Sequence, residues 1–292
     1  MPRTRDIRRR IKSVKNTAQI TKAMQMVAAS KMRKAQQAAL AGRPYARLMN
    51  AVLAEVTFHA GDFTHPLMAA REVRRRALIV VSTDKGLCGA LNSNLLREAA
   101  KLERQTTVFI TAGRKAAQFI ARTRRQLAAE FSYHDTPAFG EARAIAKFAR
   151  DLFLEGTVDQ VEILFTNFIS TLAQQPQMQV LLPIGEITGV NAGVRGHPAD
   201  AVLLKGSTEF LFEPGPEEVL GELLPHYLNF KVYQLLLEAK ASEHSARMVA
   251  MKNATDNANQ LIKDLTLDYN KLRQSNITKE LLEISSAAMA LG

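Results

Sequence analysis

MKNATDNANQLIKDLTLDYNKLRQSNITKELLEISSAAMAL (residues 251–291) indicates the fold most directly, because its apolar and small residues recur at spacings of three and four. They are Met251, Ala254, Ala258, Leu261, Leu265, Tyr269, Leu272, Ile277, Leu281, Ile284, Ala288 and Leu291. Such spacing, sustained over about six heptads, is typical of a coiled-coil helix. The five-residue step from Leu272 to Ile277 is expected to rewind the coil locally.

This helix is predicted to begin near Glu217 and to reach Leu291. No proline follows Pro225, and no glycine lies between Gly221 and Gly292. At about 1.5 Å per residue the helix would be roughly 110 Å long, far longer than a globular core of this size needs. The length predicts a helix that pairs with another long element.

The N-terminal segment, residues 3–58, has the matching pattern. It lacks proline between Arg3 and Arg43, and its apolar or small residues also follow helical spacing. They are Ile7, Ile11, Val14, Ala18, Ile20, Met24, Val27, Ala28, Met32, Ala35 and Ala39. This seam is rich in Ala and Met, so a partner helix can approach closely, and Gly42 with Pro44 marks an expected kink. We therefore expect a long antiparallel coiled coil of the two terminal segments, residues 1–58 and 217–292.

The net charge is concentrated in the same N-terminal segment. The chain holds 39 Lys or Arg and 28 Asp or Glu, a formal net charge of +11. Residues 1–50 carry thirteen of the basic residues and one acid, whereas residues 217–292 carry eight basic and ten acidic residues. A basic helix can face nucleic acid, anionic lipid or an acidic protein surface, and a merely solvated helix face is the alternative.

The middle of the chain, residues 74–213, alternates strand and helix signals. Strands are predicted over residues 77–82, 107–110, 158–170 and 177–182, and helices over 91–102, 114–122 and 140–153. Asn92 and Asn94 are candidate caps of the first of these helices. This alternation indicates a Rossmann-like α/β domain with a mainly parallel sheet. Residues 185–206 are glycine-rich and polar and are expected to form a flexible loop.

Composition excludes several classes of protein. The 292 residues are 47% hydrophobic and 23% charged, which argues against disorder. The only cysteine, Cys88, cannot form an internal disulfide framework or a thiolate zinc cluster. The sequence contains no run of 18 apolar residues, so no membrane span is predicted. The basic N-terminus lacks the apolar core of a secretory signal. An Arg-rich transit peptide is disfavoured because the helical pattern starts by Ile7.

Catalytic patterns are weak. The turn TDKGLCGALN (residues 83–92) joins a predicted strand to a predicted helix. Gly86 and Gly89 do not complete the nucleotide-binding motif GxGxxG, and the motif GxxxxGK[ST] is absent. We therefore expect a tight backbone turn and no phosphate-binding loop. Cys88 within it is expected to be buried and unreactive. The six histidines form neither HxxH nor HExxH. Paired carboxylates, Glu280 with Glu283 and Glu238 with Glu243, could transfer protons, although helix exteriors commonly carry such pairs for solubility. We expect no cofactor, no metal and no catalytic residue.

Several long motifs resemble the gamma subunit family of F-type ATP synthases. They are ITKAMQMVAASKMRKAQ (residues 20–36), KGLCGALN (85–92), ASEHSARMVAMKNATDNANQL (241–261) and LTLDYNKLRQSNITKELLEI (265–284). The resemblance covers essentially the whole chain and is to a bacterial form. Chloroplast relatives carry a cysteine pair in a redox loop, so the single Cys88 implies that no thiol switch is present.

The resemblance implies a non-catalytic central shaft. In the family, the paired terminal helices enter a hexamer of alternating alpha and beta subunits, and the α/β domain sits with the epsilon subunit on the membrane ring of c subunits. Proton-driven rotation of the ring then drives the beta subunits through their catalytic states. These implied partners would place the chain at the cytoplasmic face of the bacterial cell membrane as a peripheral subunit.

The family's contact residues carry over to matching positions of this sequence. Contacts with the alpha and beta hexamer are implied for Met24, Arg247, Gln274, Thr278, Glu280, Glu283, Leu282, Ile284, Ala288 and Leu291. In EFLFEPG (residues 209–215), Phe210, Phe212 and Glu213 resemble a segment on the c-ring and epsilon side. Family members often have Tyr at the two aromatic positions, where this chain has Phe, which keeps the apolar contact but lacks the hydroxyl.

The basic collar of the shaft is expected to meet acidic loops of the surrounding subunits through weak, exchangeable ion pairs, because a rotating bearing cannot rest in a deep energy well. Arg33 belongs to this collar, and Arg33→Ala is expected to change coupling only modestly; loss of the assembled complex would contradict this. Two rival interpretations remain at this stage, a basic coiled-coil protein that binds nucleic acid and a small nucleotide enzyme that uses the GLCGALN turn. A salt-dependent DNA shift assay tests the first and titration with ATP tests the second.

Overall fold

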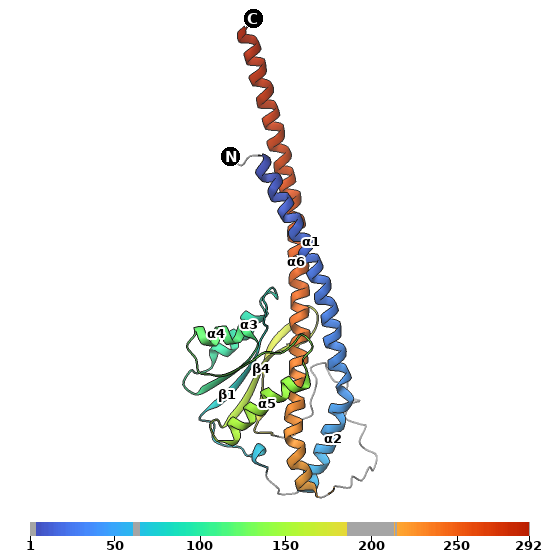
Figure 1. The fold of residues 1–292 in the computed structure, drawn as a ribbon, viewed down its shortest axis with the longest axis vertical. Coiled ribbons are helices and arrows are strands. Elements are labelled where there is room, and N and C mark those ends of the chain that lie inside the picture. The colour runs from blue at the N-terminus through green and yellow to red at the C-terminus, as the bar shows by residue number, and fades with distance from the viewer. Residues whose placement is uncertain (1–3, 61–64, 186–212, 214, 292) are drawn as a thin grey trace. The chain divides into compact units, whose positions relative to one another are not determined.

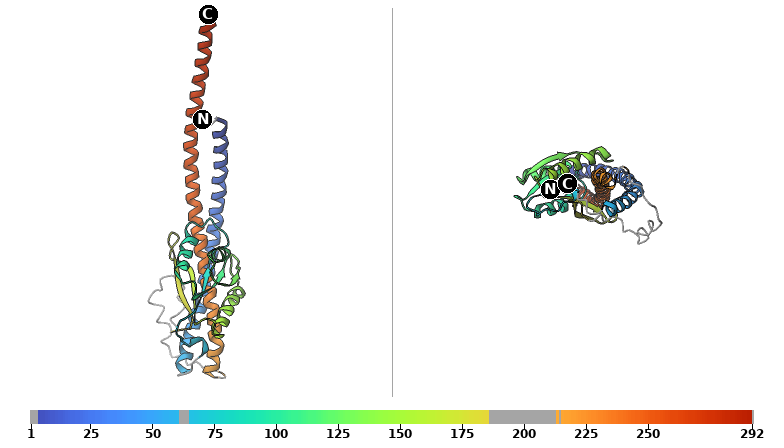
Figure 2. Two further views of the ribbon diagram at one scale, coloured as in Figure 1. Left: turned by 90° about the vertical axis from the view of Figure 1, so that its left-hand side faces the viewer. Right: turned by 90° about the horizontal axis from the view of Figure 1, so that it is seen from below.

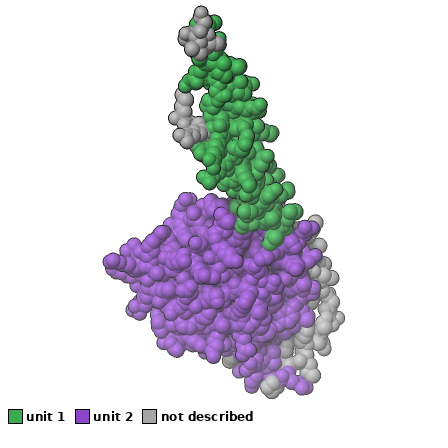
Figure 3. All heavy atoms as spheres, turned by 45° about the horizontal axis from the view of Figure 1, so that its top comes forward, with its two compact units in different colours: residues 1–27, 248–292 green, residues 28–247 purple. Residues whose placement is uncertain are grey.

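The computed structural model describes residues 4–60, 65–185, 213 and 215–291. Contacts within the chain divide it into two compact units, which are residues 1–27 with 248–292 and residues 28–247 (Figure 3). The first unit therefore joins the two ends of the sequence, and the second contains everything between them.

Three helices form the two terminal segments. They are α1 (Thr4–Ala41), α2 (Arg43–Ala60) and α6 (Pro216–Leu291), which runs for 76 residues with Pro225 inside it. The predicted C-terminal helix and the predicted break near Gly42 are thus confirmed. A Cβ at position 42 would lie 2.1 Å from Nε2 of Gln234 on α6, so this flexible side chain would have to move to admit one. Glycine at this position allows that close approach.

The α/β part of the second unit contains one five-stranded sheet within residues 65–185, in the order β3-β2-β1-β4-β5. The strands are β1 (Arg76–Val81), β2 (Thr107–Ala112), β3 (Leu127–Phe131), β4 (Gln160–Phe168) and β5 (Gln174–Leu182). The β1 strand pairs in parallel with both β2 and β4, and β2 pairs in parallel with β3. Only the β4–β5 pair is antiparallel. The predicted, mainly parallel sheet is confirmed.

The two faces of the sheet bury different helices. Successive residues of β1 alternate between the faces, as the strand period requires. Leu78 and Val80 pack with helices α3 (Leu91–Lys101) and α4 (Arg114–Arg122). Ala77, Ile79 and Val81 belong to a larger core with α5 (Phe139–Leu154), α2 and the first part of α6.

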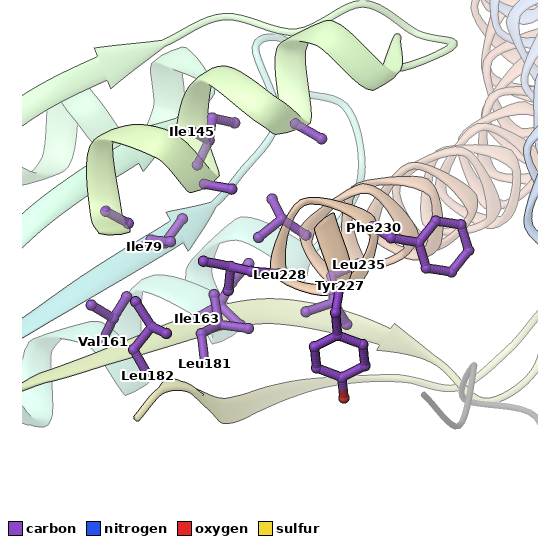
Figure 4. Packing of buried hydrophobic residues seen from close by; sticks show 14 of the residues in the cluster. Ile79, Ile145, Val161, Ile163, Leu181, Leu182, Tyr227, Leu228, Phe230 and Leu235 are labelled. Atoms are coloured by element: carbon purple, nitrogen blue, oxygen red, sulfur yellow. The ribbon is translucent and has the colours of Figure 1, made fainter. Parts of the chain in front are cut away.

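Helix α6 therefore forms part of the α/β core as well as a terminal segment. Figure 4 shows Leu228 of α6 between Ile145 of α5 and Ile163 of the sheet, and Leu235 belongs to the same core. Phe230 points to the other side of α6, where its ring lies 4.8 Å from that of Tyr45 on α2. Each side of this helix is buried against a different element, which explains why its sequence shows no single polar face here.

Three details differ from the sequence predictions. The edge strand β3 was not predicted, because LAAEF is rich in Ala, is largely exposed and has little strand propensity. The β5 strand begins at Gln174, before the predicted start, and accommodates Pro176 because it lies at the edge of the sheet. The predicted capping by Asn92 or Asn94 is wrong, since Ala90 is the N-cap of α3 and makes no side-chain cap bond.

Among the described residues, no helix is both long enough and apolar enough to cross a bilayer. Of the loop predicted over residues 185–206, only Gly185 is described, and residues 186–206 lie outside the described part of the chain.

Candidate functional site

The two terminal segments pair within the first unit. The start of α1 and the later part of α6 lie side by side and run in opposite directions (Figures 1 and 2). The hydroxyl groups of Thr21 and Thr255 form a buried hydrogen bond of 2.7 Å across the pair. Arg8 donates a 2.5 Å hydrogen bond to the hydroxyl of Tyr269 and lies 5.4 Å from the centre of its ring. The predicted antiparallel pairing of the terminal helices is confirmed.

The seam between the paired helices is made mostly of small or flexible side chains. Ala18 on α1 and Met251, Ala258 and Leu265 on α6 are all buried. Small residues allow two helices to approach closely, and methionine fills the remaining gaps. The seam ends near Leu272, because every described side chain from Arg273 to Ala287 is exposed. Figure 2 shows this last part of α6 continuing beyond the start of α1.

The unpaired end of α6 carries an apolar surface. Ile277, Leu281 and Ile284 follow the spacing of one helix face, and all three are exposed, as are Leu282 and Met289. Leu282 and Ile284 were predicted to contact the hexamer, and they are 65% and 67% exposed. Ala288 and Leu291 lie in α6, but their side chains are outside the described part. Contiguous exposed apolar residues on a helix mark a surface that contacts another protein.

Polar residues predicted as contacts lie on the same helix end. Gln274, Thr278, Glu280 and Glu283 are all exposed. The Thr278 hydroxyl donates to the backbone oxygen of Gln274 over 3.0 Å, and Lys279 lies 4.0 Å from Glu283. Each of these contacts is local to one or two turns of the helix. The surface is therefore mixed, with apolar and charged residues both reachable by a partner.

Two predicted contact residues lie on α1. Met24 is half-buried in the first unit, and Arg33 is exposed in the second. Every described Lys and Arg from Arg5 to Lys34 is exposed, so the predicted basic collar is a solvated surface of α1.

Arg247, also predicted to contact a partner, is used inside the chain. Its guanidinium donates to the backbone oxygens of Lys85 and Gly86 at 3.3 Å, and it lies 2.8 Å from a carboxylate oxygen of Glu243. The turn after β1 therefore presents carbonyl oxygens to a cation on α6. Leu87 and Gly89 have positive φ angles of 63° and 60°, which confirms the predicted tight turn.

Cys88 lies in this turn and is buried. Burial raises the pKa of its thiol, so the fraction of reactive thiolate is small. Asn92, expected to be a helix cap, instead donates from its amide to the hydroxyl of Thr83 at 2.8 Å and to the sulfur of Cys88 at 3.3 Å. The prediction of a buried cysteine is confirmed, and the side chain of Asn92 stabilises the turn.

A buried charged cluster on α6 was missed by the sequence analysis. Lys240, Glu243, His244 and Arg247 occupy successive turns of one helix face, with Lys240 only 2% exposed. The amine of Lys240 lies 3.0 Å from Glu243 and 4.3 Å from the centre of the Tyr133 ring. The sequence did contain a signal, because these four ionisable residues follow one another at spacings of three, one and three in a segment with buried neighbours. Of the predicted pair of carboxylates, Glu243 belongs to this cluster, whereas Glu238 accepts a bond from the backbone of Phe168.

His244 is the one neutral member of this cluster. Burial lowers the pKa of its imidazole from 6.5 to about 4, against the raising effect of Glu243 and Asp135. The Arg247 guanidinium lies 3.5 Å from Nδ1 of His244. Nδ1 can accept a hydrogen bond from the guanidinium only when the ring is neutral and carries its proton on Nε2. No three described residues of the types that bind metals come together as a metal site.

Of the three residues predicted to lie on the side of the c-ring and the epsilon subunit, the structure describes only Glu213. Glu213 is exposed, and Phe210 and Phe212 lie outside the described residues.

Comparison with known proteins places these features in a family. A family model described as ATP synthase matches residues 3–291. Curated ATP synthase gamma chains from Opitutus terrae and Methylacidiphilum infernorum are 50% and 46% identical to this chain, and each alignment covers at least 99% of both proteins.

Solved structures show the same fold. A chain of the Tetrahymena thermophila mitochondrial ATP synthase central stalk and c-ring is 26% identical, with a TM-score of 0.60, over 80% of this chain and 99% of its own. A chain of the Euglena gracilis mitochondrial ATP synthase is 21% identical, with a TM-score of 0.68, over 99% of this chain and 94% of its own.

Proposed function

This chain belongs to the gamma-chain family of ATP synthases, and from that premise we propose that it is the central rotor shaft that couples rotation of a c-ring to the catalytic cycle of the beta subunits. The shaft itself carries out no chemistry. Proton flow would turn the ring and the shaft together, and the shaft would push each beta subunit in turn through its catalytic states, in synthesis or in hydrolysis of ATP.

The observation that carries the proposal is the end of α6. Its apolar residues remain exposed after the chain has folded. Because helices in proteins gain most of their stability from packing an apolar face against another element, this end of α6 lacks a packing partner among the described residues. Such a surface needs a surrounding protein, and the hexamer of alpha and beta subunits would supply it. The apolar part would turn within the bearing, while exposed polar residues would make contacts that exchange during rotation.

The contacts with the hexamer are assigned to the residues predicted from the sequence. They are Met24, Arg33, Arg247, Gln274, Thr278, Glu280, Leu282, Glu283, Ile284, Ala288 and Leu291. Arg247 would act there through the helix that it helps to hold, since its guanidinium also bonds the turn after β1. Phe210, Phe212 and Glu213 are assigned to the side of the c-ring and the epsilon subunit, and the chain would lie as a peripheral subunit at the cytoplasmic face of the bacterial membrane.

Reconstitution with purified alpha and beta subunits tests the proposal. The full chain is expected to form an active ATPase, and a chain truncated after Ala241 is not. Leu281→Asp is a sharper test, because it places a charge on the apolar surface without touching the pair of helices. It is expected to lower the ATPase activity of the complex several-fold, since a buried unpaired carboxylate is costly.

Leu267→Asp is the matched control. Leu267 lies on the same helix and is 60% exposed, against 61% for Leu281, but it is outside the unpaired end. Its substitution is expected to leave the activity within about twofold, as surface changes usually do. Equal losses for both variants, or no association of the full chain with alpha and beta, would refute the proposal.

The alternative of a nucleic-acid-binding coiled coil finds no support in the comparisons. It would also leave the exposed apolar end of α6 without a role, because nucleic-acid contacts are mainly basic and polar.

A further inference from the structure

One aspartate in the second unit connects α1, the α/β part and α6. Asp135 lies in the loop between β3 and α5, and its Oδ2 accepts a hydrogen bond from the amine of Lys31 on α1. Its Oδ1 lies 3.9 Å from the amine of Lys240 and 3.9 Å from Nε2 of His244, both on α6. A single carboxylate therefore faces cations from two helices that are far apart in the sequence.

The α6 side of this connection is buried. The Lys240 side chain is 3% exposed, and its amine is paired with Glu243 at 3.0 Å and lies over the ring of Tyr133. The Tyr133 hydroxyl in turn donates a 3.0 Å hydrogen bond to the backbone oxygen of Ser82, directly after β1. The position of Asp135 relative to α6 is thus determined by buried groups of the sheet and the helix.

The α1 side is less strongly specified by packing. The buried residues of α1 on either side of Lys31 are Ala28, Met32 and Ala35. Small and flexible side chains form a smooth surface, which defines the register between two elements poorly. A single polar contact at such a surface can favour one register over others, as single polar residues do at the seam of coiled coils.

Asp135 remains charged in this position. Burial alone would raise the pKa of its carboxyl group, but the hydrogen bond and charge of Lys31, with the charge of Lys240, bring the pKa below its ordinary value. Its side chain is 50% exposed and that of Lys31 is 44% exposed, so the ion pair is only half-buried. The hydrogen bond from Lys31 nevertheless requires one relative position of the two side chains.

We propose that Asp135 is a positioning residue that holds the Lys31 segment of α1 in one register against the α/β part and α6. The proposal rests on the proposed function, because a shaft that transmits torque needs its two helices to turn without slipping past each other. The ion pair sets the register, and the burial of Ala28, Met32 and Ala35 supplies most of the stability.

The test compares Asp135→Asn, Lys31→Met and the double variant in the full chain, with Lys34→Met as the matched control. Lys34 is an exposed lysine on the same helix, one turn away. Amide hydrogen exchange of residues 28–41 is measured first. Lys31→Met and Asp135→Asn are each expected to raise the exchange rates by about two- to fivefold, the double variant by no more than either, and Lys34→Met hardly at all.

The second measurement uses the complex reconstituted with alpha and beta subunits and the membrane sector in vesicles. Asp135→Asn is expected to lower the protons pumped per ATP hydrolysed while ATP hydrolysis continues, an effect that a general loss of stability would not give. Exchange effects of Lys31→Met equal to those of Lys34→Met, full additivity of the two single variants, or an unchanged pumping ratio would each overturn the proposal. If the unsubstituted chain restores no ATPase, the proposed function fails, and the exchange measurement still decides whether the register link exists.

Discussion

Glu243→Gln should destabilise the second unit because it removes one charge from a buried network and keeps nearly the same shape. Glu243 is 4% exposed and lies between two cations, Lys240 at 3.0 Å and Arg247 at 2.8 Å. Asp135 stands 3.9 Å from Lys240 and cannot replace this partner at hydrogen-bond distance. The substitution therefore leaves a buried ammonium group with incomplete compensation.

The expected cost follows from this geometry. Removing one member of a buried ion pair typically costs about 3–5 kcal/mol. The lower end applies here, because glutamine can still accept one hydrogen bond and Arg247 reaches solvent with 13% of its side chain exposed. About 3 kcal/mol should lower the melting temperature of a unit of this size by roughly 6–12 °C.

Urea unfolding of the full chain, followed by circular dichroism and by amide exchange in residues 76–168, measures the effect. Glu222→Gln is the matched control, since it makes the same change at an exposed position of α6 and should alter stability by less than about 0.5 kcal/mol. Adding Lys240→Met to Glu243→Gln should recover part of the loss, because the uncompensated charge is then gone. A cost below about 1 kcal/mol for Glu243→Gln, or a double variant less stable than the single one, would refute the reasoning.

Two further predictions concern the same unit. His244 stays neutral in the folded chain down to pH about 4 but takes up a proton near pH 6.5 when the chain is unfolded. The free energy of unfolding should therefore decrease by roughly 2–4 kcal/mol as the pH is lowered from about 6.5 to about 4. His244→Gln should flatten this decline in urea unfolding at pH 7 and 4.5, and an unchanged slope would contradict the assignment. Gly113 has a φ of +103°, and a Cβ there would lie 2.2 Å from the backbone oxygen of Ser82, so Gly113→Ala should cost more than about 2 kcal/mol. Gly140→Ala, where a Cβ meets nothing within 4 Å, should be neutral or stabilising, and equal thermal melts for the two variants would show that the backbone at Gly113 adapts.

Local periodicity explains why much of the fold was readable from the sequence. The spacings of three and four in residues 251–272 specify one face of a helix whatever surrounds it, and ALIVV (residues 77–81) is apolar and β-branched enough to indicate a buried strand. The residues of the unpaired end of α6 continued the same pattern. Their resemblance to a family supplied a function for it that the pattern could not.

The exposure of that end was decided by length. The described part of α1 begins at Thr4 and pairs with α6 only as far as Leu272, so the apolar residues that follow have no cover within the described chain. A sequence pattern shows which residues are able to pack, but it does not show where the partner helix stops. The edge strand β3 is a similar case, since pairing with β2 makes LAAEF a strand despite its weak propensity.

The sequence by itself thus determined the long terminal helices, their antiparallel pairing, the parallel strands other than β3 and the tight turn around Cys88, because each depends on a local or repeating pattern. Only the tertiary structure decided the partners of Asp135, the bonds of Arg247 to the turn after β1 and the neutral state of His244. These depend on contacts between residues such as Lys31 and Asp135, which are 104 positions apart. Burial by distant elements, which no local pattern records, sets the charge state and the partner of a polar side chain.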